Sequence, residues 1–153
     1  MADIRIKVAK DKAKLIKDLK VDEETTGAFQ SYVDVLVFAA ALGAKHGKRE
    51  PIQEYSKEID PIRQDIFSNK GYDQVINLLA ITAKNDPKVL ASNESAEEER
   101  IKIFEEYANA GLEILTQVFR GSADYFEQIR LFINKQKISS SNSEGEFDLS
   151  DLL

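Results

Sequence analysis

The sequence predicts a mainly α-helical protein that begins with one short β-strand and ends in a disordered acidic tail. Three observations lead to this expectation. Apolar and polar residues alternate over residues 4–8, which is the period of a strand. Apolar residues then recur every three or four positions up to about residue 135, which is the period of helices packed on a core. From residue 139 onward serine, asparagine and acidic residues predominate, a composition typical of disorder.

The composition is that of a globular protein in a reducing compartment. With 153 residues, of which 42% are hydrophobic and 31% charged, the chain can bury a core. It has no cysteine, which excludes disulfides and thiolate metal sites. The longest uncharged apolar run, residues 35–44, is well short of the roughly 18 residues of a membrane span, and no signal peptide is visible. We therefore expect a cytoplasmic protein with no membrane partner.

Charge is distributed unevenly along the chain. The net charge is −6, yet residues 1–20 hold seven basic against three acidic side chains, whereas residues 51–153 hold 11 basic against 19 acidic ones. An acidic protein binds DNA only if its cations are gathered in one place. The sequence gathers them at the amino terminus.

The segment Ile4-Arg5-Ile6-Lys7-Val8 is the predicted strand. Its period places Ile4, Ile6 and Val8 on one face and the cations Arg5 and Lys7 on the other. A single short strand needs a partner for its backbone groups, and no similar strand follows. We therefore expect the same strand of a second copy to pair with it, giving a homodimer whose two-stranded ribbon fits the DNA major groove.

Two predicted helices follow the strand. Residues 10–20 carry an apolar stripe among lysines, and residues 31–42 are apolar almost all round, with Gly43 and Gly47 as expected terminators. This order resembles the ribbon-helix-helix family of DNA-binding proteins over about the first 45 residues, although the connector over residues 21–30 is long and acidic. The resemblance implies groove contact through Arg5 and Lys7. The candidates for phosphate anchoring are Lys10, Lys12, Lys14 and Ser31.

Further helices are expected to pack on this part, so we divide the chain into residues 1–50, 51–137 and 138–153. Asp60-Pro61 has the form of a helix start, and residues 73–84 are too apolar to be exposed. Ser95 with Glu98 is a capping-box pattern for the longest helix, which should reach residue 119 or 120. A last helix is expected over residues 123–135.

The end of the chain combines acids with a few large apolar residues. Residues 139–153 hold four acids and no base. The apolar residues of this tail are candidates for binding a partner protein: Phe147, Leu149, Leu152 and Leu153. The tail could instead lie on the cationic strand in place of DNA, or serve only as a solubilising end.

Enzyme signatures are missing from the sequence. There is no glycine-rich phosphate loop, no cysteine nucleophile and no Glu-x-Lys of the common metal-dependent nucleases. The only histidine, His46, has no partner at a useful spacing, and the carboxylates Glu105, Glu106 and Glu113 are expected to be solvated on a long helix. The sequence therefore predicts no catalytic residues, no metal and no cofactor.

Three longer segments resemble a bacterial family. They are residues 32–49 (YVDVLVFAAALGAKHGKR), Ile66-Phe67 with Gly71-Tyr72-Asp73, and residues 97–115 (EEERIKIFEEYANAGLEIL). Together they look like the DNA phosphorothioation (Dnd) system-associated protein 4 family over residues 3–135. The resemblance implies a small accessory of a defence system linked to DNA modification and restriction, and it implies no active site.

Three hypotheses for the function result. The first is a dimeric, non-enzymatic DNA-binding accessory or regulator that uses the ribbon. The second is an adaptor without DNA contact, whose strand pairs with the sheet edge of a larger defence protein. The third is an acidic DNA mimic, supported only by the negative charge of residues 51–153.

Overall fold

The structure, a computed structural model, describes residues 3–21, 28–120 and 125–144 and is mainly helical, as the sequence predicts. No β-sheet occurs in these ranges; three isolated β-bridges are the only strand-like pairings. In chain order the elements are η1 (Lys10–Lys12), α1 (Ala13–Leu19), α2 (Tyr32–Lys45), α3 (Gln64–Ser68), α4 (Asp73–Lys84), η2 (Pro87–Leu90), α5 (Glu94–Val118) and α6 (Tyr125–Glu144).

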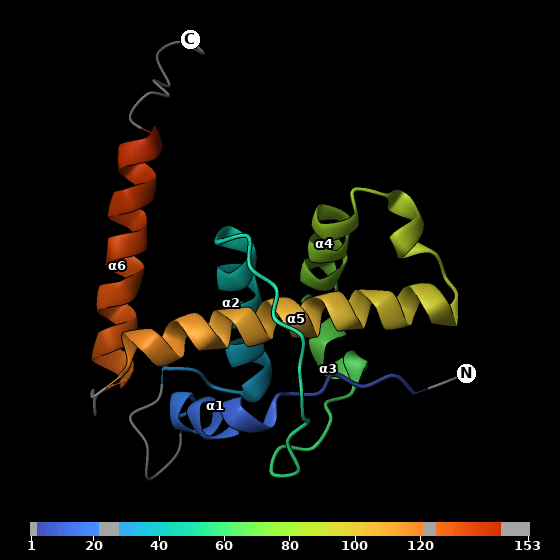
Figure 1. The fold of residues 1–153 in the computed structure, drawn as a ribbon, viewed down its shortest axis with the longest axis horizontal. Coiled ribbons are helices and arrows are strands. Elements are labelled where there is room, and N and C mark those ends of the chain that lie inside the picture. Colours follow the sequence, from blue (N-terminus) through green and yellow to red (C-terminus); the bar gives the residue numbers. More distant parts are fainter. Residues whose placement is uncertain (1–2, 22–27, 121–124, 145–153) are drawn as a thin grey trace.

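Helix α5 is the axis of the fold. It runs across the middle of the molecule, with α2 packed across it and α4 and η2 against its first half (Figure 1). Its buried side chains include Phe104, Leu112 and Leu115, each no more than 1% exposed. Phe104 meets Phe67 of α3 edge-to-face, with ring centroids 5.5 Å apart. The hydrophobic core therefore lies around α5, as the apolar period of residues 101–119 predicts.

Two glycines let α2 and α5 approach each other closely. A Cβ on Gly111 of α5 would lie 1.7 Å from the carbonyl oxygen of Ala39, and one on Gly43 of α2 would lie 2.2 Å from that of Tyr107. At each glycine the backbone of the other helix therefore occupies the space that a side chain would need. Gly43 was expected to end its helix, but α2 continues to Lys45, so this prediction is wrong. Gly43 allows close packing of α2 against α5 and does not end the helix.

The predicted amino-terminal strand is not seen. Residues 4–9 are extended, but they form only two isolated bridges, Ile6 with Ile62 and Ala9 with Tyr55. Ile6 and Val8 are buried and Lys7 points outward, so the predicted alternation of faces is present. The partner of the segment is the irregular stretch 54–62 of its own chain, which has no strand pattern. The two-stranded ribbon is thus absent from the described residues, and pairing with a second copy stays a prediction.

Several helix starts differ from the expected ones. The longest helix is capped by Asn93, whose side chain accepts from the N–H of Ala96, two residues before the predicted cap Ser95. Asp60-Pro61 does not start a helix, because α3 begins only at Gln64. By contrast α4 spans the predicted residues 73–84, and the helix predicted from residue 31 is present as α2, with Ser31 as its N-cap.

Helix α6 stands out from the body at the carboxyl end of α5 (Figure 1). It continues to Glu144, so residues 139–144 are helical where disorder was predicted. Extending an existing helix adds a hydrogen bond for each residue fixed, without a new nucleation cost. No described helix is both long enough and apolar enough to cross a membrane.

Candidate functional site

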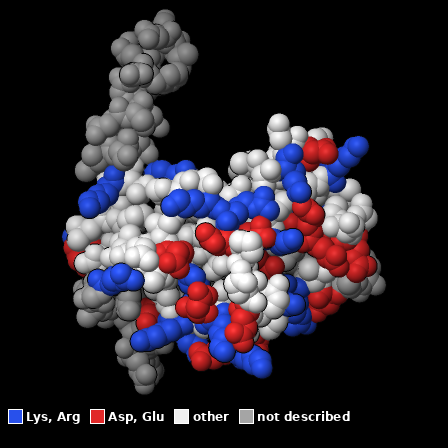
Figure 2. Space-filling model, in the orientation of Figure 1, with Lys and Arg blue, Asp and Glu red and all other residues white. Residues whose placement is uncertain are grey.

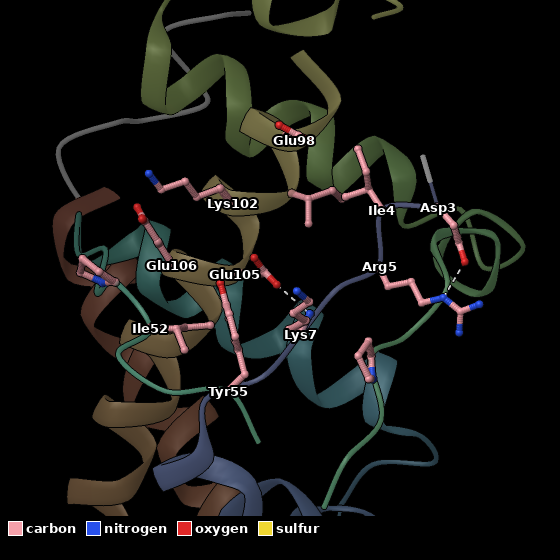
Figure 3. Close-up of a pocket in the computed structure, with 13 residues that line it drawn as sticks. Asp3, Ile4, Arg5, Lys7, Ile52, Tyr55, Glu98, Lys102, Glu105 and Glu106 are labelled. Atoms are coloured by element: carbon pink, nitrogen blue, oxygen red, sulfur yellow. Dashed lines mark hydrogen bonds and ion pairs between the residues drawn. The ribbon is translucent and has the colours of Figure 1, made fainter. Parts of the chain in front are cut away.

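A groove lies between the amino-terminal segment, the stretch 51–61 and helix α5 (Figure 3). Its volume is about 520 Å³. The amino-terminal segment forms one wall with residues 3–5 and Lys7, and α5 forms the facing wall with residues between Glu98 and Glu106. We call this the N-terminal groove. It brings Arg5 and Lys7, the two residues expected to read DNA, to one site.

The backbone of the amino-terminal segment is bonded along one edge. Ile6 and Ile62 exchange two hydrogen bonds, of 2.9 and 2.8 Å. The carbonyl of Val8 accepts from Ser56 N–H, and the N–H of Lys10 donates to the carbonyl of Glu54. Successive residues of an extended chain direct their backbone groups to opposite edges. The backbone groups of Ile6, Val8 and Lys10 therefore form the edge of the segment that is hydrogen-bonded to residues 54–62.

The backbone groups of Arg5 and Lys7 form the other edge of the segment. This edge faces α5 and the groove. The N–H of Lys7 donates to Glu105 Oε2 at 2.6 Å. Within the described part of the chain, the backbone N–H and C=O of Arg5 and the C=O of Lys7 make no hydrogen bond. This open edge, residues 5–7, has the spacing of backbone groups that an added strand would use.

Glu105 is the unusual carboxylate of the site. It is partly buried between α5 and the amino-terminal segment. Burial raises its pKa to about 7, against the lowering effect of the Lys7 N–H and of the Lys7 charge, and the neighbouring charge of Glu106 raises it further. Glu105 is therefore close to half protonated at neutral pH. Its carboxyl group is the hydrogen-bond acceptor for the N–H of Lys7 on the open edge.

Aromatic and aliphatic side chains line the rest of the groove. Tyr55 is 47% exposed, and Lys7 Nζ lies 4.8 Å from the centroid of its ring. Burial, with the charges of Glu105 and Glu106, raises the pKa of Tyr55 above its usual value. Ile52 and Ile101 add aliphatic surface between the polar side chains. Such a lining suits a ligand with both apolar and polar parts.

Most of the cations expected to bind DNA are engaged with acids of the same chain. Arg5 Nε lies 2.7 Å from Asp3 Oδ2, and Lys10 Nζ lies 3.3 Å from Glu54 Oε1. Lys12 is only 5% exposed and pairs with Asp11 and Glu113, at 3.0 and 3.1 Å. A phosphate would reach the Lys12 ammonium only if this pairing opened.

Lys14 and Ser31 lie in different environments. Lys14 is exposed on α1, and no ion pair to it occurs in the described residues. Ser31 caps α2, donates to Asp34 Oδ2 at 2.9 Å, and accepts from Lys70 Nζ at 2.9 Å. The Ser31 hydroxyl is thus already bonded to side chains of its own chain. Ser31 does not line the N-terminal groove.

Charges of both signs are mixed over the molecular surface in view (Figure 2). Around η1 and α1, in the lower part of the figure, basic side chains alternate with acidic ones. One of these pairs joins Lys17 Nζ to Glu58 Oε2 at 2.7 Å. Glu54, Glu58 and Glu113 therefore lie beside the cations of residues 1–20 and offset part of their positive charge.

The sequence did not indicate the rest of the groove. Glu105 was expected to be solvated, and it is covered because the amino-terminal segment crosses α5 above it. Its neighbour Glu106 is only 8% exposed and accepts from Arg49 Nε and Nη2, at 3.1 and 2.8 Å. No local pattern reveals either contact, because their partners are 98 and 57 positions away in the chain. The four tail candidates, Phe147, Leu149, Leu152 and Leu153, lie outside the described residues.

The described residues offer no metal centre. No group of three or more histidine, aspartate or glutamate side chains in these ranges could hold an ion. Three of the four acids that line the groove are instead bonded to basic side chains or to backbone: Asp3 to Arg5, Glu106 to Arg49 and Glu105 to the N–H of Lys7. The groove is suited to binding through hydrogen bonds and apolar contact.

Comparison with known proteins identifies the family. No protein of curated function and no solved structure matches the chain. A family model, described as DNA sulphur modification system-associated protein 4, matches residues 5–152. The match includes the groove residues from Arg5 onward and continues past residue 135, into the tail. The chain therefore belongs to the DNA sulphur modification system-associated protein 4 family.

Proposed function

We propose that the protein is a non-enzymatic adaptor of its DNA sulphur modification system, and that the N-terminal groove binds an extended segment of a larger protein of that system. The segment would pair with the open edge of residues 5–7 as an added strand. The observation that carries the proposal is this edge, on which three of the four backbone groups make no hydrogen bond within the described residues and which faces a groove of about 520 Å³ rather than the core.

The chemistry of the groove supports such a ligand. Strand addition supplies main-chain hydrogen bonds, while pockets for alternate side chains supply specificity. Ile52, Tyr55 and Ile101 offer apolar contact beside the open edge. A backbone carbonyl of the ligand would replace Glu105 as the acceptor for Lys7 N–H, and Glu105 would turn toward solvent, where its ionised form is better hydrated.

DNA binding through Arg5 and Lys7 is the second candidate. The exposure of Lys7 and Lys14 favours it. The ion pairs of Arg5, Lys10 and Lys12 oppose it, because each would have to exchange an internal acid for a phosphate. The acids at residues 54 and 113 would also repel the DNA backbone.

Two substitutions at one position distinguish the candidates. Arg5→Pro removes the N–H of the open edge, whereas Arg5→Ala keeps that N–H and removes the cation. If the groove binds by strand addition, affinity for a co-expressed protein of the system should fall about tenfold or more in the proline variant and stay within about twofold in the alanine variant. Calorimetry with the purified partner measures both.

Alanine substitutions at Arg5 and Lys7 test the DNA alternative. A DNA titration across salt concentrations should show no steep salt dependence for an adaptor. If instead Arg5→Ala and Lys7→Ala abolish a salt-dependent DNA affinity at unchanged thermal stability, the adaptor proposal is wrong. Tyr55→Ala, which removes a groove wall without touching the backbone, should weaken only the protein complex and guards against misfolding of the proline variant.

A further inference from the structure

A second groove lies where α6 leaves the body. It has a volume of about 580 Å³ and lies between the end of α5 and the outer side of α6. Its lining includes Val118 of α5 with Leu131 and Phe132 of α6. Leu131 is 48% exposed, although Ile129, two positions before it, is only 5% exposed. Helix α6 therefore has an exposed large apolar side chain, Leu131, in addition to the apolar side chains that it packs against the core.

We propose that this α6 groove is the docking site of the protein's own carboxyl-terminal segment, residues 145–153. The proposal is independent of the function assigned to the N-terminal groove. It is based on three properties of the two parts: reach, apolar content and charge.

The segment is long enough to reach the groove. Helix α6 ends at Glu144, 13 positions after Leu131, so these two residues lie about 20 Å apart along the helix at about 1.5 Å per residue. The nine residues that follow can extend about 30 Å. A chain that reverses after Glu144 can therefore run back along α6 to Leu131 and Val118.

The composition of the segment complements the groove. Leu149, Leu152 and Leu153 stand at positions i, i+3 and i+4, which one turn of helix would place on a single face, and Phe147 adds a large ring. The acids Glu146, Asp148 and Asp151 are not balanced by any base in this segment. The cation lining the groove is Lys135, and it lies on the tail side of Leu131 along α6. Apolar groups would thus cover apolar groups, with acids beside a lysine.

The family match supports a defined role for this segment. It extends to residue 152, so it includes Phe147, Leu149 and Leu152 together with the residues of the α6 groove. A purely solubilising end would require acids and small polar residues, but not four large apolar side chains in its last seven positions. Those side chains would be left in water unless a surface received them.

The chain offers a clean optical test, because it contains no tryptophan. Leu152 lies eight residues beyond Glu144, far enough along an extended chain to reach the groove. In the full-length protein carrying Leu152→Trp, we expect emission shifted to the blue and acrylamide quenching several-fold weaker than in a peptide of residues 144–153 with the same substitution. Adding Leu131→Asp should restore the spectrum and the quenching of the peptide. Leu78→Asp is the matched control, since Leu78 of α4 is 63% exposed and does not line the groove.

Three results would overturn the proposal. The first is a peptide-like spectrum in the singly substituted protein. The second is release by Lys7→Glu rather than by Leu131→Asp, which would place the tail on the amino-terminal segment. The third is a blue shift that is lost on dilution, which would mean that the groove receives the tail of a second copy. Circular dichroism of each variant separates loss of docking from loss of fold.

Discussion

Replacing Gly111 by alanine should destabilise the protein by about 3 kcal/mol or more, although it adds only one methyl group. The new Cβ would lie 1.7 Å from the carbonyl oxygen of Ala39, which belongs to the backbone of α2 and cannot rotate away. The two helices would have to separate, and the buried contacts around Leu36, Ala40 and Ala108 would loosen with them. Urea unfolding followed by circular dichroism measures the change.

Gly47→Ala is the matched control for this effect. Gly47 has a φ of +64°, but none of the described residues comes within 4 Å of the position that its Cβ would take. Alanine there should therefore cost only about 1 kcal/mol, from backbone conformation alone. Gly43→Ala, which meets the carbonyl of Tyr107 at 2.2 Å, should behave like Gly111→Ala. Similar costs at positions 43, 47 and 111 would show that α2 and α5 do not pack as described.

The second large effect concerns the dependence of stability on pH. The pKa of Glu105 rises from 4.5 to about 7 in the folded protein, mainly because of burial. Between these two values the folded state binds more protons than the unfolded state, so stability should fall as pH rises from about 4.5 to about 7. The lost free energy should be of order 2 kcal/mol, allowing for the partial exposure of the carboxyl group.

Glu105→Gln isolates this contribution. Glutamine keeps an oxygen that can accept from the N–H of Lys7 but does not ionise. The variant should be more stable than the parent at pH 8, should differ little from it at pH 4.5, and should show a flatter profile between them. The pKa values of Asp34, Glu99 and Glu113 are lowered, so their effects fall below about pH 4.5 and leave this window clear. Parallel profiles for parent and variant would mean that Glu105 is not buried.

The helical part of the fold could be predicted from local patterns. The helix over residues 73–84 was identified from its apolar period, and the helix that begins near residue 31 from its long apolar run, because both signals are contained in a few neighbouring residues. Gly43 was misread for the same reason. Glycine commonly ends a helix, and nothing local distinguishes that role from a close approach to the backbone of a helix 64 positions further on.

The candidate site could be predicted only in part. The alternation at residues 4–8 correctly placed Ile6 inside and Lys7 outside, since side-chain direction is a local property. It gave no information on which backbone edge would be paired, and the partner came from an irregular stretch around Ile62. Arg5 and Lys7 do lie in the groove, but the carboxylate that holds its backbone edge was invisible until the chain was folded across α5.

The length of α5 fixes the distance between the two grooves. Glu105, at the N-terminal groove, and Val118, at the α6 groove, stand on the same continuous helix, 13 residues or about 20 Å apart. The rise per residue of an α-helix is fixed by its hydrogen-bonding pattern, so this distance is set by the number of residues between the two positions. Any ligands of the two grooves would therefore be held at a constant separation, set by the length of α5 between them.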